Sequence, residues 1–193
     1  MNIRGLRVAF AVGLGLLIGL STAGAQQGGR GGFRLVALKV ESSAFEDGGV
    51  VPVKYAGSAN VGGNVQPGFT FSNMPEDAVS IAIILHDLDV ALNSGTEDVL
   101  HWIAWNIPAS AGGVPEGGLP EGSVQGTNLM RQTSYFGPGA PAGERYHHYV
   151  FEFYALNANI DLPETAGRAE LLAAMQNKVV AKAAYVGRYR GMQ

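Results

Sequence analysis

Short apolar stretches alternate with turn-forming residues along most of the chain. The stretches are rich in β-branched and aromatic residues and are bounded by Gly, Pro, Asn or Asp, which is typical of β-strands. The pattern predicts strands over residues 33–40, 50–55, 68–71, 79–85, 101–107, 148–156 and 179–186. Two segments, 79–85 and 149–156, are almost continuously apolar, so we expect them to be central strands buried on both faces.

One segment, residues 165–177, has the spacing of an amphipathic helix, and Thr165 is a candidate N-cap. Its apolar stripe consists of Ala169, Leu171, Leu172 and Met175. Residues 107–145 form a long connection rich in Gly and Pro, and such connections in compact domains are usually functional or disordered. The chain has no internal repeat and no heptad pattern. We therefore expect a mainly β fold, a β-sandwich with one peripheral C-terminal helix.

The first 25 residues have the organisation of a secretory signal peptide. Arg4 and Arg7 precede an uncharged apolar run over residues 8–20, and small residues at Ala23 and Ala25 follow it. The run is shorter than the roughly 20 residues that a membrane-spanning helix requires. We expect cleavage near Ala25 and a periplasmic or secreted protein without a stable membrane span, with an uncleaved anchor as the alternative.

The remaining chain has the size of a single domain. Residues 26–32 contain four glycines and little to bury, which indicates a flexible linker, and we expect the domain to occupy residues 33–193. The chain has no cysteine, so its stability comes from packing without disulfides. Loss of Arg4 and Arg7 with the signal changes the formal charge from −3 to −5, which argues against nucleic acid as a partner.

Ionisable residues gather at the ends of three predicted strands. Asp87 and Asp89 follow one strand, His101 begins the next, and residues 147–149 (His-His-Tyr) begin a third. Strand ends are places where a packed scaffold presents polar groups, and an imidazolium or a phenol can donate hydrogen bonds to an anion. The alternative is a set of ordinary polar residues at the rim of the sandwich.

Several motifs occur in one order along residues 33–191. They are His86-Asp87-Leu88-Asp89, the stretch 101–108 (HWIAWNIP), the stretch 137–141 (GPGAP) and His147-His148-Tyr149, together with 41–48 near the start and 184–189 near the end. In this order the motifs resemble the phosphatidylethanolamine-binding protein (PEBP) family, and most of all its bacterial Raf kinase inhibitor-like branch. The resemblance implies a Greek-key β-sandwich of two sheets with a small pocket for a phosphate-type group or a phosphoethanolamine-like head group.

The resemblance also assigns residues to the pocket. By position, the ligand-binding residues are Asp87, His101, Gly139, His147 and Tyr149, and the supporting residues are Asp89, Trp102 and Pro141. The imidazoles, the phenol and a backbone N–H near Gly139 would donate to the ligand, while Asp87 would orient a histidine. The chain departs from the usual D-P-D-A-P run of the family at Leu88, Val90 and Ala91, so the shape of this loop stays open.

Other functions stay open at this point. Asp87, Asp89, His101 and His147 could hold a divalent cation, but the sequence lacks the paired-histidine spacing that places ligands on one element. No serine has a recognisable nucleophile context for a hydrolase. Regulation by binding a protein target, or as a homodimer, is a further alternative. We assign no catalytic residue, metal or cofactor.

Overall fold

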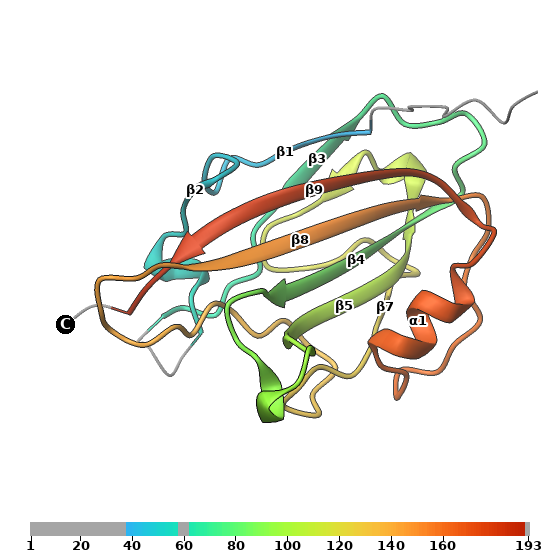
Figure 1. Cartoon of the computed structure of the whole chain (residues 1–193). Coiled ribbons are helices and arrows are strands. Elements are labelled where there is room, and N and C mark those ends of the chain that lie inside the picture. Colours follow the sequence, from blue (N-terminus) through green and yellow to red (C-terminus); the bar gives the residue numbers. More distant parts are fainter. Residues whose placement is uncertain (1–37, 58–61, 192–193) are drawn as a thin grey trace, which may run out of the picture. The chain divides into compact units, whose positions relative to one another are not determined.

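The computed structural model describes residues 38–57 and 62–191 (Figure 1). These residues belong to one compact unit, Arg34–Gln193. The predicted signal peptide, the predicted linker and the first residues of the predicted domain lie outside the described residues. Within the described ranges, no helix has the length and apolar character that crossing a bilayer requires.

The described chain is mainly β and forms two sheets, as expected. The strands are β1 Lys39–Glu41, β2 Gly49–Val50, β3 Phe69–Ser72, β4 Ser80–Asp87, β5 Val99–Pro108, β6 Gly113–Val114, β7 Val124–Gln125, β8 His147–Leu156 and β9 Val179–Tyr189. The larger sheet has the order β2-β9-β8-β4-β5-β7, and the smaller has the order β1-β3-β6. Figure 1 shows β9, β8, β4 and β5 side by side as the long strands.

Strands β4 and β8 are the central pair that the apolar runs predicted. All eight residues of β4 are buried, and β4 pairs antiparallel with β5 on one side and β8 on the other. Strand β8 also pairs with β9 along its full length. Apolar side chains on both faces of β4 are what a strand packed between two layers requires.

Two predicted elements differ from the structure. The strand expected over 50–55 is instead the short β2, followed by the 3-10 helix η1 (Val53–Tyr55). Pairing with β9 ends here because Pro52 has no N–H for the ladder. Two further 3-10 turns, η3 and η4, are Leu92–Ser94 and Ala109–Ala111.

The helix α1 spans Arg168–Ala174, so it is shorter than predicted. Its N-cap is Gly167, whose N–H donates to Oε2 of Glu170 at 3.1 Å. Thr165 was the wrong N-cap because it lies in a preceding turn, which is closed by a 2.9 Å hydrogen bond from Ala166 N to Pro163 O. Figure 1 shows α1 beside the β5 and β7 side of the large sheet.

Apolar side chains form two layers on opposite faces of the large sheet. One layer lies between the sheets, where the Phe69 ring of β3 packs on Phe151 and Phe153 of β8 with centroids 5.0 Å apart. The other layer packs against α1 through Leu171. Trp102 belongs to the first layer and Trp105 to the second, because residues three apart in a strand face opposite sides.

Candidate functional site

Four strand ends meet at one end of the large sheet (Figure 1). Strand β4 ends at Asp87, where β5 begins, and β8 begins where β9 ends. In register, Asp87 lies opposite Tyr149, and His147 lies opposite Tyr189. Asp87, His147 and Tyr149 all project from the face that packs against the smaller sheet, so the sequence-predicted groups converge here.

A β-bulge brings His101 into the same group. Leu85 pairs with Trp102 while His86 pairs with Leu100, so His101 is an extra residue in β5. Such bulges redirect a side chain. The His101 ring lies edge-on to the Tyr149 ring, with centroids 5.1 Å apart and an angle of 81° between the planes.

Asp87 joins the ends of two strands. Its side chain is buried, and Oδ2 lies 2.8 Å from Nδ1 of His147. The other oxygen, Oδ1, accepts the backbone N–H of Asp89 at 2.9 Å. Because an ionised carboxylate can only accept, Nδ1 of His147 carries the hydrogen and Nε2 is left for another partner.

His101 is held by Phe136, a residue that the sequence did not predict for the site. Nδ1 of His101 lies 2.8 Å from the Phe136 carbonyl oxygen, and the two rings stack at 5.1 Å with an angle of 6° between their planes. Burial lowers the pKa of His101 below its ordinary value, although the carbonyl and the charge of Asp87 act in the opposite direction. The ring is therefore neutral near pH 7.

Tyr149 occupies the centre of the group. Its side chain is fully buried, and its hydroxyl oxygen accepts the backbone N–H of Gly139 at 3.2 Å. Burial, followed by the negative charge of Asp87, raises the pKa of Tyr149 well above its ordinary value. The side chain is thus a neutral phenol, and its hydroxyl also hydrogen-bonds with the Asp87 carboxylate.

The loop that carries Gly139 is fixed by contacts with two distant segments. Gly137 N–H donates to Oδ1 of Asn64, and Gly57 N–H donates to the Pro138 carbonyl, both at 2.8 Å. A Cβ on Gly137 would collide with the carbonyl oxygen of Tyr55. Beyond Gly139, the loop is held by the Gly191 N–H, which donates to Ala140 O at 3.0 Å.

The three residues predicted to support the site have different environments. Asp89 pairs with Arg145 and accepts from the backbone N and Nδ1 of His148 at 2.6 and 2.9 Å. Although burial opposes it, these hydrogen bonds hold the pKa of Asp89 below its ordinary value. Asp89 thus fixes the start of β8. Trp102 is in the core and donates to Gln125, and Pro141 is exposed.

His86, the fourth histidine, faces the opposite side of the sheet. Its Nδ1 lies 2.5 Å from Oδ2 of Asp98, which also pairs with Arg168 of α1. Its Nε2 lies 3.7 Å from Oε2 of Glu152. The sequence placed His86 in a family motif but gave no role to this cluster, whose members come from β4, β8, α1 and the loop before β5.

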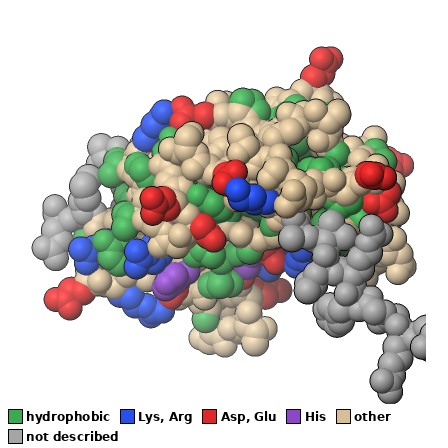
Figure 2. Space-filling model, turned by 90° about the horizontal axis from the view of Figure 1, so that it is seen from above, with side chains coloured by type: hydrophobic (Ala, Val, Ile, Leu, Met, Phe, Trp, Pro, Cys, Tyr) green, Lys and Arg blue, Asp and Glu red, His purple; other side chains and the backbone are tan. Residues whose placement is uncertain are grey.

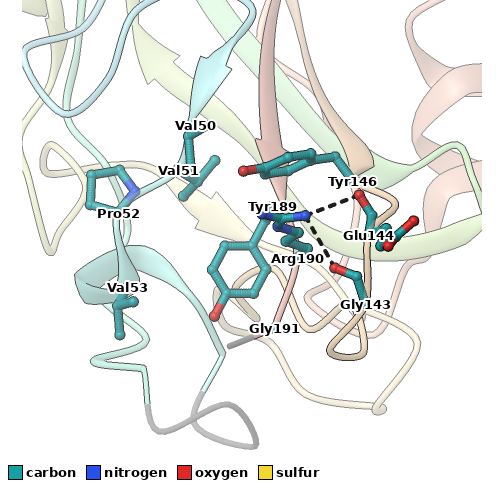
Figure 3. Close-up of a pocket in the computed structure, with 10 residues that line it drawn as sticks. All are labelled: Val50, Val51, Pro52, Val53, Gly143, Glu144, Tyr146, Tyr189, Arg190 and Gly191. Atoms are coloured by element: carbon teal, nitrogen blue, oxygen red, sulfur yellow. Dashed lines mark hydrogen bonds between the residues drawn. The ribbon is translucent and has the colours of Figure 1, made fainter. Parts of the chain in front are cut away.

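A cavity of about 570 Å³ lies beside the strand ends and is lined partly by Tyr189, the register partner of His147. Figure 3 shows Arg190 donating to the carbonyls of Gly143 and Glu144, with the Tyr146 and Tyr189 rings on either side of the Arg190 side chain. On the face shown in Figure 2, histidine reaches the surface among acidic and basic side chains.

Across residues 38–57 and 62–191, no three His, Cys, Asp or Glu side chains are grouped closely enough to hold a metal ion.

Comparisons with known proteins agree with this architecture. The family model for phosphatidylethanolamine-binding protein matches residues 41–190. A UPF0098 protein of Methanothermobacter thermautotrophicus is 35% identical over 158 residues, covering 79% of this chain and 99% of that protein. LppC of Mycobacterium tuberculosis, whose name provisionally calls it a lipoprotein, is 32% identical over 80% of this chain and 73% of its own length.

Two solved structures have the same fold. Escherichia coli YbcL, described as a member of the mammalian PEBP family, superposes with a TM-score of 0.73 at 28% identity, covering 79% of this chain and 98% of YbcL. CT736 of Chlamydia trachomatis, described as a candidate PEBP homologue, has a TM-score of 0.71 at 29% identity, covering 80% of this chain and 98% of CT736. With its two-sheet fold and the match over residues 41–190, this chain belongs to the phosphatidylethanolamine-binding protein family.

Proposed function

We propose that this chain is an exported PEBP-family protein that binds a small anionic ligand at the strand ends around Tyr149. The ligand class is a phosphate-type group or a phosphoethanolamine-like head group, which accords with the name of the family. The single observation that carries the proposal is the meeting of Asp87, His101 and His147 around one buried phenol. Burying several polar groups together in a protein interior is costly, and clusters of this kind are common at ligand-binding sites.

The hydrogen bonds leave suitable groups for a ligand. His101 and His147 each use Nδ1 within the protein, which leaves Nε2 of both rings. The hydrogen bond between Gly139 N–H and the Tyr149 hydroxyl is 3.2 Å long, so a stronger acceptor, such as a phosphoryl oxygen, competes well for the N–H. Backbone and phenol donors at the end of a rigid sheet suit binding better than they suit a nucleophilic reaction.

Binding is tested by titrating the purified protein with phosphate, phosphoethanolamine and acetate while the imidazole signals are followed by NMR. We expect saturable shifts of the His101 and His147 signals. His101→Ala should abolish the response of the remaining site signals, while His148→Ala should preserve it because that side chain is exposed and pairs with Asp89. Absence of saturable shifts in the wild type, or an equal response in His101→Ala, would disprove the proposal.

Export is the second part of the proposal. It is supported by the basic, apolar and small-residue segments within residues 1–25, and the similarity to a protein provisionally named a lipoprotein is compatible with it. We expect protein from a periplasmic extract to have the mass of a chain without residues 1–25. Leu16→Arg should interrupt the apolar run and retain the protein in the cytoplasm. Full-length wild-type protein confined to the cytoplasm would contradict export.

A further inference from the structure

We propose that the strand-end site selects an oxyanion that carries its own acidic O–H. Inorganic phosphate and a phosphomonoester in its singly protonated form belong to this class. Sulfate and phosphodiesters, which have no O–H on the anionic group near neutral pH, do not. The inference rests on the proposed function, because it specifies which anion the site around Tyr149 accepts.

The argument begins with the direction of the His101 ring. Nδ1 lies 2.8 Å from the Phe136 carbonyl oxygen, and a carbonyl can only accept, so Nδ1 carries the hydrogen. A neutral imidazole has one N–H, so Nε2 then presents a lone pair. Stacking on Phe136 and the edge-on contact with Tyr149 hold the ring in this orientation.

His147 has the same arrangement. Its Nδ1–H is directed at Oδ2 of Asp87 at 2.8 Å, so a neutral ring here also presents an Nε2 lone pair. The Asp87 carboxylate is itself an acceptor and is buried beside both rings. The acceptors at the centre are therefore the Asp87 carboxylate and the Nε2 lone pair of His101.

The donors come from the other side of the group. They are the backbone N–H of Gly139, which bonds to the Tyr149 hydroxyl oxygen, and the Tyr149 hydroxyl, which has Asp87 as its own partner, so a ligand competes for both donors. A phosphate with one O–H satisfies both sets, because its proton reaches an Nε2 lone pair while its other oxygens accept from these donors. A sulfate oxygen would face that lone pair without a hydrogen between them. Sites built to accept a ligand's hydrogen reject analogues that lack it, because the buried acceptor is left unpaired.

The selectivity depends on the charge state of His101. The titratable groups near this ring are Asp87 on β4 and Tyr149 on β8, and His86, on the opposite face of β4, also acts electrostatically on the pKa of His101. Burial lowers the pKa of His101 below the usual value, so Nε2 is unprotonated near pH 7. Acidification below that pKa adds a hydrogen to Nε2 and converts it into a donor, which sulfate can use. Discrimination between phosphate and sulfate should therefore be largest above the pKa of His101.

The probe ligands differ in the pH at which they lose the last O–H proton of the anionic group. A phosphomonoester has a second pKa of about 6, so its O–H is mostly lost by pH about 7.5. Inorganic phosphate keeps one O–H at that pH, whereas sulfate and glycerophosphoethanolamine have none on the anionic group. We expect binding at pH about 7.5 to be at least about tenfold tighter for phosphate than for sulfate, and the difference to shrink at an acidic pH, about 5 or lower, that lies below the pKa of His101.

The experiment is calorimetric titration of the purified protein with these probes at both pH values, with phosphoethanolamine as the monoester. Equal affinities for phosphate and sulfate at pH about 7.5 would overturn the inference while leaving the proposed function intact. Binding of none of the probes would overturn both. Nitrogen NMR of the wild type provides a readout that needs no variant. At neutral pH we expect the Nε2 chemical shift of His101 to be that of an unprotonated ring nitrogen. A protonated Nε2 would overturn the inference.

A variant tests the role of the ring itself. His101→Gln replaces the lone pair with an amide that can present an N–H, so sulfate should gain affinity relative to phosphate by about tenfold. His148→Gln is the matched control and should leave the ratio unchanged, because His148 pairs with Asp89 and is exposed. An unchanged ratio in a folded His101→Gln protein would contradict the assignment to His101.

Discussion

Oδ2 of Asp87 lies 2.8 Å from Nδ1 of His147, while Oδ1 of the same carboxylate accepts the backbone N–H of Asp89. One buried side chain thus connects the end of β4, the loop that follows it and the start of β8. Because these segments are 60 residues apart in the chain, the contact forms only when the sheet is assembled.

Asp87→Ala should destabilise the protein. The substitution leaves the buried Nδ1 of His147 and the N–H of Asp89 without their acceptor, which we expect to lower the free energy of unfolding by about 1–3 kcal/mol. Urea denaturation followed by fluorescence measures the change. Asp161→Ala is the control, since Asp161 is exposed, and it should change the free energy by less than about 0.5 kcal/mol. Equal effects of the two substitutions would contradict this role of Asp87.

Two buried tyrosines offer a matched comparison. Tyr149→Phe removes the acceptor of the Gly139 N–H and should lower the free energy of unfolding by about 1 kcal/mol. Tyr189→Phe should be neutral or stabilising, because the Tyr189 hydroxyl is buried without a hydrogen-bond partner among the described residues. Hydrogen exchange at Gly139 should accelerate in Tyr149→Phe and stay unchanged in Tyr189→Phe. Faster exchange at Gly139 in both variants would show that the loop responds to a general loss of stability, which would contradict a specific role of the Tyr149 hydroxyl.

Stability should fall as the pH decreases through the ordinary histidine range. The pKa of His101 is lower in the folded protein than in the unfolded chain, whose histidines titrate near about 6.5. Below about pH 6.5 the unfolded chain therefore binds more protons at this position, and folding loses free energy until the pH reaches the folded pKa of His101. Denaturation midpoints at several pH values measure the slope. His101→Gln should reduce this dependence of stability on pH. An unchanged slope would show that other titratable groups cause the dependence.

Gly137 should not tolerate a side chain. A Cβ there would collide with the Tyr55 carbonyl oxygen and would lie 2.8 Å from Gly57 N, so Gly137→Ala should cost about 1–3 kcal/mol of unfolding free energy and weaken anion binding. Gly143→Ala is the control in the same connection, because a Cβ at Gly143 has no neighbour within 4 Å. Thermal unfolding and phosphate titration of both variants give the comparison. Similar losses in both would contradict the close-packing argument.

Strands could be predicted from the sequence where the polarity of their own side chains shows that they are buried. Continuous apolar runs identified β4 and β8 because both faces of these strands are buried. Strands β6 and β7 were not predicted, since each has two residues and exists through pairing with a distant partner. The long Gly- and Pro-rich connection was expected to be functional or disordered. The structure describes all of it, and it carries Phe136 and Gly139 of the candidate site.

The candidate site was predictable as a set of residue types but not as a geometry. Asp87, His101, His147 and Tyr149 were chosen from strand ends and from the family resemblance, and the structure brings them together with Gly139. Phe136 was missed because it holds His101 partly through a backbone carbonyl, which every residue has. The bulge at His101 was missed because strand register is set by pairing, not by local sequence. Anion binding and export stay predictions.

The bulge has a consequence for how such chains diverge. His101 is the residue that the β4–β5 ladder does not use, because Leu85 already pairs with Trp102 and His86 with Leu100. Deleting it would leave these pairs in register and Trp102 in its place between the sheets, while removing the imidazole altogether. Strand pairing and the imidazole thus depend on different residues of β5, so a chain without residue 101 should still fold as a sandwich.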